Sequence, residues 1–454
     1  MLSRIANYVN RHFVGVLVSV LLGWYALTSL GRPFGDTIRS DGLGYYAYLP
    51  SLILYGDPSF RSLADAHYEG LIPGYSGLEV NPENGIYVNK FNLGVALFAL
   101  PFFLLAHGAT WLMHAPAGDI PTWWAFQYPL DGYSPFYQHA AGLSGLFYFA
   151  LGCVVLRRFL RTFFSSQASS VAILLLLFGT CWLDIGAGWS FSSHGISTLL
   201  FALFFLVANR WVDEPDRWRD TILLGALLGL IALVRVPNLL VVLALALLPS
   251  TQTTSLPAHI KRLFRLIPQF VVMAAVALVV FLPQMAFWKY GAGHWLVNSY
   301  GDRGLPHLTS PALMEVLFSL NKGIFVWSPI LLLAIPGWFT MKQERARWRL
   351  TVAVLLVLQW YVIASAAVWN AGACFGQRYF AEFQTLAAIP FAALVSRSRG
   401  RGFLWMVILA TVLWSVFLYK LYYTREISVY GLDGEAFYDI LWWRLQSLKN
   451  WWIP

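Results

Sequence analysis

Residues 38–49 read IRSDGLGYYAYL and place a carboxylate, Asp41, soon after the first long apolar run of the chain, residues 13–30. Two glycines and three tyrosines follow that carboxylate. The stretch 42–55, GLGYYAYLPSLILY, is apolar and aromatic, but it is too short to cross about 30 Å of hydrocarbon. Such a segment is typical of a helix that lies flat in the membrane interface. We therefore predict an interfacial helix directly after the first membrane span.

The composition extends a membrane interpretation to the whole chain. Of the 454 residues, 58% are hydrophobic and only 12% are charged, whereas a soluble domain carries about 25% charged residues. The formal net charge is +9, but the basic residues gather in short connections such as 342–349 and 397–401, as in cytoplasmic loops. We read this charge as membrane topology and expect no nucleic-acid partner. The three cysteines, Cys153, Cys181 and Cys374, have no metal-ligand spacing and indicate neither a disulfide framework nor a metal site.

Apolar segments recur along the chain and predict an all-α fold, a polytopic bundle of transmembrane helices in a single integral membrane domain, residues 1–454. We expect about eleven spans, at residues 13–31, 91–113, 136–156, 169–184, 194–211, 221–248, 267–287, 323–341, 350–368, 379–395 and 403–423. The segment 221–248 is interrupted at Arg235 and Pro237. Because proline disrupts a helix interior, we expect either one kinked span or two short ones there.

The long connection 32–90 is expected outside the cytoplasm, because a basic N-terminus precedes the first span. The connection 288–322 is expected on the same side, because the basic segments 341–349 and 396–402 mark the cytoplasmic side of the second half. The Trp-rich tail 424–454 is expected outside or in the interface. Residues 56–90 are rich in Gly, Pro and Asn, which predicts loop. Only two clear spans separate 32–90 from the cytoplasmic-looking arginines that follow residue 156, so the charge rule gives residues 32–160 no consistent topology.

Charged groups at or inside a bilayer are costly and are therefore functional candidates by default. Asp41 is the first, with Asp36 as a fallback; its structural alternative is the N-cap of the following helix. His194 lies in WSFSSHG at the start of a span. Four cations are expected on the outer side, where basic residues are usually scarce: Lys90, Arg303, Lys322 and Arg378.

Several cations on that side predict a bound anion, and phosphate is the natural candidate because guanidinium and ammonium groups hold it through charge-assisted hydrogen bonds. The chemistry this suggests is sugar transfer from a lipid phosphate. Asp41 would deprotonate the acceptor hydroxyl while cations stabilise the departing phosphate. His194 would assist in binding, and Tyr45 and Tyr46 would contact lipid or sugar. Inverting transfer needs one base and no covalent intermediate.

These residues resemble the GT-C-fold glycosyltransferases, a polytopic class that uses polyprenyl-phosphate-linked sugars and includes the protein O-mannosyltransferases and the aminoarabinose transferases of lipid A. The family has an essential acid after the first span, where Asp41 stands in RSDGLGYY, followed by interfacial helices. Aminoarabinose transferases have a phosphate-binding lysine at the start of the second span, where Lys90 stands in VNKFNLG. The segments LNKGIFVWSPILLLAIPG, WNAGACFGQRYFAEFQTLAAIP and SFSSHGIS look like parts of bacterial relatives. Here Asp41 lacks an acidic neighbour, so no metal role of paired acids follows, and the prolines usual after the lysine are missing.

The resemblance implies an inverting glycosyltransferase that moves a sugar from a polyprenyl-phosphate donor to an extracytoplasmic glycolipid, polysaccharide or protein. We expect it in a bacterial inner membrane and expect no required cofactor, with the role of a divalent metal open. Two alternatives stay open. A transporter or flippase for lipid-linked saccharides would place charges on a central path between repeated halves, and we find no repeat. A saccharide ligase or polymerase would rely on a large late loop, whereas 288–322 is only moderate in length.

Overall fold

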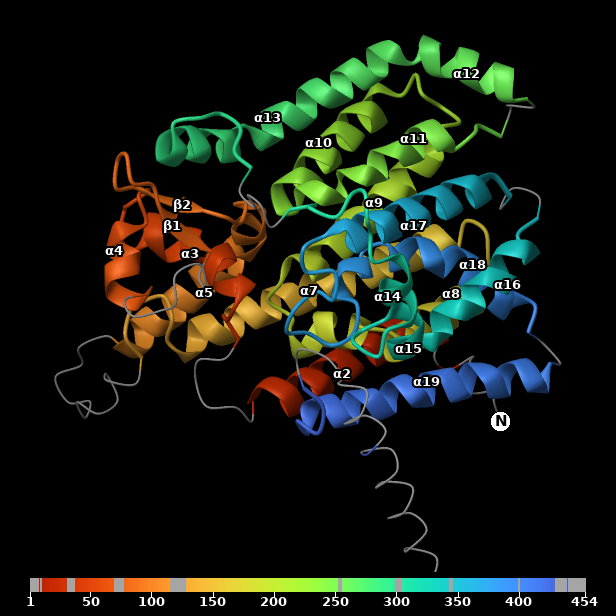
Figure 1. Ribbon diagram of the computed structural model, residues 1–454, viewed down its shortest axis with the longest axis horizontal. Coiled ribbons are helices and arrows are strands. Elements are labelled where there is room, and N and C mark those ends of the chain that lie inside the picture. Colours follow the sequence, from red (N-terminus) through yellow and green to blue (C-terminus); the bar gives the residue numbers. More distant parts are fainter. Residues whose placement is uncertain are drawn as a thin grey trace, which may run out of the picture. The chain divides into compact units, whose positions relative to one another are not determined.

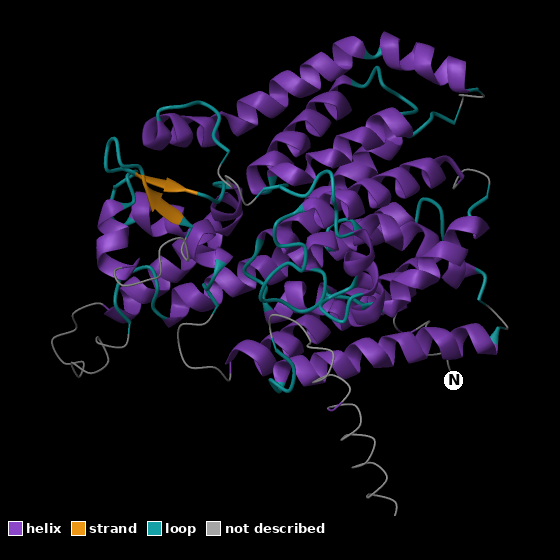
Figure 2. Cartoon of the chain, viewed as in Figure 1, coloured by secondary structure: helices purple, strands orange, loops and turns teal. Residues whose placement is uncertain are grey.

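The computed structural model describes residues 8, 10–30, 37–68, 77–114, 128–251, 255–298, 304–342, 346–398, 401–428 and 439. Within these residues the chain is predominantly helical (Figure 1), and the strands are confined to one small sheet (Figure 2). The chain divides into two compact units. Unit 1 comprises Met1–Phe13, Leu160–Leu183 and Asp302–Pro454, and unit 2 comprises Val14–Phe159 and Asp184–Gly301.

Most described elements of unit 2 are helices. In chain order they are α2 (Phe13–Tyr25), η1 (Ala26–Leu30), α3 (Asp41–Ile53), α4 (Arg61–Leu63), η2 (Ala64–Tyr68), β1 (Leu78–Val80), β2 (Tyr87–Asn89), α5 (Gly94–His114), α7 (Pro135–Leu160), η3 (Asp184–Gly188), α9 (Ser193–Trp211), α10 (Trp218–Val234), η4 (Val236–Val242), α11 (Leu243–Leu247), α12 (Leu256–Arg265) and α13 (Ile267–Ala292). The first residue of α2 and the last of α7 are assigned to unit 1.

The regular elements in the described part of unit 1 are all helices. Its elements are α8 (Ser166–Gly179), α14 (Leu313–Phe318), α15 (Ile324–Trp327), η6 (Pro329–Leu333), α16 (Ala334–Thr340), α17 (Trp348–Ser365), η8 (Arg378–Phe380), α18 (Gln384–Ser396) and α19 (Gly402–Tyr423).

Among the described residues, six helices are long and apolar enough to cross a membrane: α5, α7, α9, α13, α17 and α19. Five shorter apolar helical segments accompany them, at Phe13–Ser29, Ser166–Gly179, Val236–Leu247, Pro329–Thr340 and Gln384–Ser396. Each of these helices lies on one of the predicted apolar segments. The polytopic helical prediction is therefore confirmed, whereas the number of segments that cross a membrane stays a prediction.

The six long helices differ in how much protein covers them. The apolar window of α9 is 78% buried, whereas that of α13 is 11% buried. Helix α9 therefore belongs to the interior of unit 2, and α13 presents apolar side chains such as Leu278 and Val279 outward. Its opposite face packs on α10, where Gly225 and Gly229 let the two helices approach closely.

The predicted span 221–248 is not one kinked helix but two helical segments, and whether each crosses a membrane stays a prediction. Helix α10 ends at Val234, Arg235 is extended with φ −161° and ψ 105°, and the 3₁₀ helix η4 follows with Pro237 in its first turn. Proline is well suited to that position because its missing N–H has no partner at a helix start. The interruption thus leaves Arg235 between two helices rather than inside one.

The prediction of loop for residues 56–90 is wrong at the short helices α4 and η2 and at the strands β1 and β2. The two strands pair antiparallel with Leu78 opposite Asn89. The asparagines that suggested loop close this hairpin. The side chains of Asn81 and Asn84 accept from backbone N–H groups in the turn, and both donate to the Gly291 carbonyl oxygen, at 2.9 and 3.1 Å. These bonds fasten the hairpin to the end of α13, beside which it lies in Figure 2.

The core of unit 1 is built around α18, in which all residues from Gln384 to Val395 are buried. Helices α16 and α8 pack on it. At Gly337 of α16 an added Cβ would lie 2.1 Å from the Pro390 carbonyl oxygen, so only glycine permits this approach. Helix α18 therefore has no face left for lipid.

Candidate functional site

Asp41 is the first residue of α3, not its N-cap. The cap is Ser40, which has φ +51° and makes no capping hydrogen bond through its side chain. A positive φ is unusual for a residue other than glycine, and such strain tends to occur at functional sites. Asp41 is half-buried. Its carboxylate stands in the first turn of a helix, where the helix dipole stabilises negative charge.

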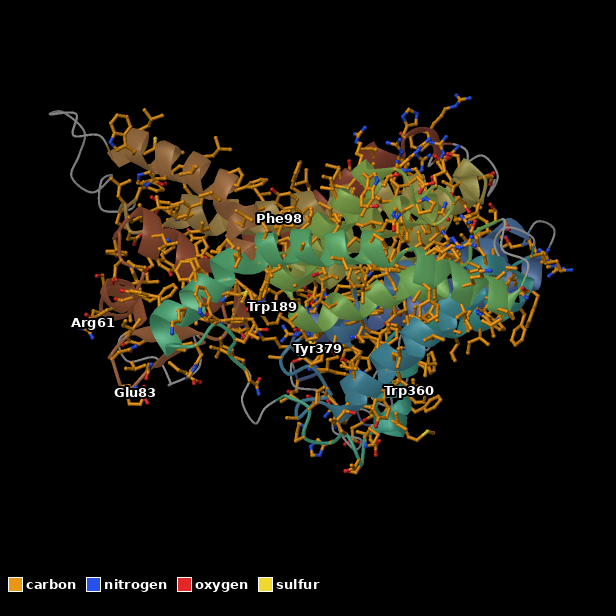
Figure 3. All side chains as sticks on the ribbon, turned by 90° about the horizontal axis from the view of Figure 1, so that it is seen from above. Arg61, Glu83, Phe98, Trp189, Trp360 and Tyr379 are labelled. Carbon is orange, nitrogen blue, oxygen red and sulfur yellow. The ribbon has the colours of Figure 1, made fainter. Side chains whose placement is uncertain are left out.

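Helix α3 is held against the start of α9. The Tyr45 hydroxyl donates to Ser193 Oγ at 3.2 Å. A Cβ added to Gly42 would lie 3.3 Å from the Phe191 ring, so the first turn of α3 and this ring are in close contact. The residue just before the turn, Arg39, places its guanidinium 5.2 Å from the Trp189 ring centroid (Trp189 is labelled in Figure 3).

The segment that carries Lys90 contacts the same helix from another direction. Asn89 Nδ2 donates to the Gly44 carbonyl oxygen at 2.8 Å. The ring of Phe91 packs on Tyr45 with centroids 4.6 Å apart. Lys90 stands between these two anchors, is half-buried, and has Nζ 5.6 Å from the Phe91 ring centroid. It directly follows β2 and lies four residues before α5 begins at Gly94, whereas the predicted span began at residue 91.

His194 and Arg235 meet each other directly. His194 is 2% exposed in the first turn of α9, and its Nε2 lies 3.3 Å from Arg235 Nη1. Because a guanidinium only donates, Nε2 is the acceptor and the imidazole is neutral in this pair. A second bond joins the same elements, since Asn238 Nδ2 donates to Ser197 Oγ at 3.1 Å.

The interruption at Arg235 also packs on the Lys90 segment. Asn92 Nδ2 donates to the Ala232 carbonyl oxygen at 3.1 Å. At Gly94 an added Cβ would lie 2.4 Å from the Leu233 carbonyl oxygen, so the two backbones touch.

Four segments of unit 2 thus form a closed ring of contacts, and we call them the four-segment cluster: residues 38–45, 89–94, 190–197 and 232–238. Each segment contacts the next through at least one side-chain hydrogen bond. The cluster carries Asp41, Lys90, His194 and Arg235, three of which the sequence singled out as site residues. With Arg39, which lies in the first segment, it combines one carboxylate, three cations and one imidazole.

Two further predicted residues of unit 2 serve α3 itself. Tyr45 and Tyr46 are 5% and 1% exposed, and the Tyr46 hydroxyl donates to the Gly132 carbonyl oxygen at 2.6 Å. These hydroxyls fix the helix that carries Asp41. A contact of either ring with lipid or sugar stays a prediction.

The other predicted cations belong to unit 1. Lys322 is fully buried at φ +66°, and its ammonium group donates to the Gly372 carbonyl oxygen and lies 3.9 Å from Cys374 Sγ. Arg378 is 8% exposed, begins η8 and has Cζ 5.7 Å from the Tyr379 ring centroid. Arg303 and Asp36 lie outside the described residues.

Sequence reasoning missed several polar groups of the cluster. The hydroxyls of Ser190 and Ser192 are buried and have no hydrogen-bond partner among the described residues. The Gln138 side chain accepts from the Ile38 N–H at 2.9 Å and so braces the approach to Asp41. For Ser190 and Ser192, the sequence did offer a signal: three serines stand next to one histidine in an otherwise apolar stretch. Gln138 gave none, because it is a single amide in a long apolar helix.

The three cysteines are buried and unbridged. Among the residues that the structure describes, no group of three or more His, Cys, Asp or Glu side chains is placed to hold a metal ion.

Fold and composition define a polytopic helical membrane protein. No protein-family model matches the chain, and no curated protein matches it significantly. Among solved structures, the chain is similar to the crystal structure of ArnT from Cupriavidus metallidurans in the apo state. The TM-score is 0.48 at 16% sequence identity, over 88% of this chain. The match covers 62% of the ArnT chain, so this chain spans less than two thirds of that protein's length.

Proposed function

We propose that this chain is an inverting glycosyltransferase that moves a sugar from a polyprenyl-phosphate donor to an extracytoplasmic acceptor, with Asp41 as the general base. The acceptor is a glycolipid, a polysaccharide or a protein. The active side faces away from the cytoplasm, and the membrane is the inner membrane of a bacterium. The four-segment cluster is the observation that carries the proposal.

The cluster supports the chemistry because it offers the required groups on rigid elements. Asp41 accepts the proton of the acceptor hydroxyl as that oxygen bonds to the anomeric carbon. The bond from the anomeric carbon to the phosphate oxygen breaks, and the polyprenyl phosphate leaves with the electron pair. Attack from the face opposite the phosphate inverts the configuration, and no covalent enzyme intermediate forms.

The cations of the cluster suit the leaving group. The Lys90 ammonium and the Arg235 guanidinium are the charged donors that phosphate oxygens prefer, and negative charge grows on those oxygens as the bond breaks. His194 accepts from Arg235, so it orients the guanidinium without opposing its charge. Arg303, Lys322 and Arg378, which the sequence also predicted to bind phosphate, belong to unit 1 and are not part of the four-segment cluster.

The test is sugar transfer by purified protein in nanodiscs, comparing wild type with Asp41→Asn and using radiolabelled polyprenyl-phosphate sugars and membrane glycolipids. Asparagine keeps the size of the side chain but cannot take a proton. We expect Asp41→Asn to lower the rate by about 10²- to 10⁴-fold, the usual contribution of a general base. Asp65→Asn is the matched control, because Asp65 is exposed in the same connection.

Equal rates in wild type and Asp41→Asn would remove Asp41 from the base role and turn attention to Asp36. Saturable binding of the lipid donor without transfer of any sugar would favour a flippase instead.

A further inference from the structure

The connection between α11 and α13 contains α12 (Leu256–Arg265), a helix that contributes nothing to the four-segment cluster. Its start is well defined. Ser255 Oγ accepts from the Ala258 N–H at 3.4 Å, and Pro257 stands in the first turn, where its missing N–H needs no partner. A single residue, Leu266, separates the helix from α13. Helix α12 therefore has its own capping residues and forms as a separate element.

One face of α12 is fastened to the rest of unit 2. His259 is buried, and its Nε2 donates to the Ala246 carbonyl oxygen at 2.6 Å. The Arg262 guanidinium donates to the Val212 carbonyl oxygen and also interacts with the charge of Asp213. These contacts fix the rotation of the helix about its axis, so they decide which side chains point away from the protein.

The outward face of α12 carries an apolar stripe. Leu256, Ile260 and Phe264 follow each other at intervals of four residues, which places them on one side of a helix. Their exposed fractions are 71%, 46% and 67%. Ile267 and Val271, at the start of α13, continue this spacing and are exposed as well. A row of exposed large apolar side chains marks a surface for a partner or a membrane.

Basic residues border this stripe. Lys261 and Arg265 each come one residue after a member of the stripe, which places them about 100° further round the helix, and both are exposed. The sequence of α12, LPAHIKRLFR, includes no acidic residue. Long basic side chains at the edge of an apolar stripe can reach phosphates while the stripe contacts acyl chains.

The position of α12 within unit 2 favours a membrane as the partner. Helix α13 has 26 residues, or about 39 Å, and its apolar window is almost free of protein contacts. The β1–β2 hairpin is fastened to Gly291 at the far end of α13, and Figure 1 shows α12 and the hairpin at opposite ends of this helix. A helix that crosses a bilayer has its two ends at the two surfaces. Crossing by α13 would therefore put α12 at the surface opposite the hairpin.

We propose that α12 binds the anionic surface of the membrane, with its apolar stripe among the upper acyl chains and with Lys261 and Arg265 on headgroup phosphates. The stripe supplies burial of apolar area, and the two exposed cations select a negatively charged surface. The predicted orientation of the chain makes this the cytoplasmic surface. The proposal needs only that the chain lies in a membrane, so it can fail or hold independently of the glycosyltransferase activity.

Spin labels on the full chain in nanodiscs test where α12 lies. A label at Phe264→Cys should be more accessible to oxygen, which concentrates among acyl chains, than to a water-soluble nickel complex. Leu278→Cys in the middle of α13 and Asp216→Cys in the exposed connection before α10 are the references for acyl chains and for water. The native cysteines are buried, so wild type treated in the same way gives the background.

Two outcomes of this measurement would overturn the proposal. A label at Phe264 that is as accessible to nickel as the label at Asp216 would leave α12 in water. A label that is shielded from both reagents would mean that protein, either a partner or a second copy of the chain, covers the stripe.

A second measurement tests the preference for anionic lipid. A fluorescent label at the same Phe264→Cys is quenched by lipids with brominated chains, and brominated phosphatidylglycerol is compared with brominated phosphatidylcholine. Each basic residue near an anionic surface changes lipid affinity by about fivefold, so we expect at least a fivefold preference for phosphatidylglycerol. Lys261→Gln together with Arg265→Gln should abolish the preference, because glutamine keeps most of the side chain and the helix propensity but has no charge.

The matched control is Lys289→Gln, which removes an exposed cation at the opposite end of α13 and should leave the preference unchanged. Equal quenching by the two lipids in the labelled parent, or the same preference with and without the two cations of α12, would overturn the proposal.

Discussion

Lys90 and Lys322 were both predicted to bind phosphate, and the structure gives them different surroundings. Lys90 in unit 2 is half-buried between two residues that anchor α3, with its ammonium group over an aromatic ring. Lys322 in unit 1 is fully buried, and its ammonium group already donates to a backbone carbonyl of the connection between α17 and η8. That connection contains Ala371, Gly372 and Gly376 at positive φ.

The difference teaches how a membrane protein uses a cation. An ammonium group that holds a strained connection in place contributes to the fold, and the connection positions Arg378. For the Lys90 ammonium group, beside a helix that begins with a carboxylate, we propose a ligand-binding role instead. We therefore expect changes at the two lysines to separate into a loss of stability and a loss of binding.

The largest effect is expected for Lys322→Met, which keeps the length of the side chain but removes the donor to Gly372. A buried carbonyl left without its partner, in a connection with positive-φ residues, should lower the free energy of unfolding by about 2–3 kcal/mol. Thermal unfolding in detergent measures this. Lys342→Met, at an exposed residue of the same unit, is the control. Unchanged stability together with lost donor binding would reassign Lys322 to the phosphate.

A smaller effect, on binding alone, is expected for Lys90→Ala. Loss of one charge-assisted hydrogen bond to phosphate costs about 1.5–3 kcal/mol, so affinity for a polyprenyl phosphate should fall at least tenfold. The folded yield and unfolding temperature should stay close to wild type. Titration of the lipid into nanodiscs measures the affinity, with the exposed Lys289→Ala as the control. Undiminished affinity would show that the two lysines do not differ in this way.

The smallest effect is expected for Asp57→Asn, in the connection that leads from α3 to the hairpin. Partial burial raises the pKa of Asp57, but hydrogen bonds from Ser59 and Ser62 outweigh it and bring the pKa to about 2. Since this lies below the ordinary value of 3.8, the carboxylate stabilises the fold above about pH 4 and loses that effect as the pH falls toward 2.

Asparagine retains one acceptor oxygen, so the free energy of unfolding at pH 7 should drop by only about 1 kcal/mol. Urea unfolding at several pH values checks this, and the gap between wild type and Asp57→Asn should narrow below pH 4. If the difference in the free energy of unfolding between wild type and Asp57→Asn is constant with pH, the charge of Asp57 plays no part. The exposed Asp65→Asn should have the same free energy of unfolding as wild type.

The sequence was sufficient for the helices, because apolar length is a strong signal. Helices α9 and α19 begin or end within a residue or two of the predicted segments 194–211 and 403–423. It was insufficient where polar residues act through tertiary contacts. The hairpin depends on Asn81 and Asn84 reaching Gly291, more than 200 residues away, and no local pattern reveals such a partner.

The candidate site was predictable in its members and not in their arrangement. Asp41, Lys90 and His194 were found because charge and imidazole are rare in this chain. Packing between distant segments brings Arg235 to His194 and Lys322 to a backbone carbonyl.

Helix α18 bears on how this chain is made. It has 13 residues, fewer than the roughly 20 that cross a bilayer unaided, and its burial leaves it no surface that lipid could wet. Helices of membrane proteins normally insert first and associate afterwards. Such a short, fully buried helix would not be stable in the membrane by itself during synthesis. Its stable insertion is therefore coupled to the presence of α8 and α16, the two helices that pack on it.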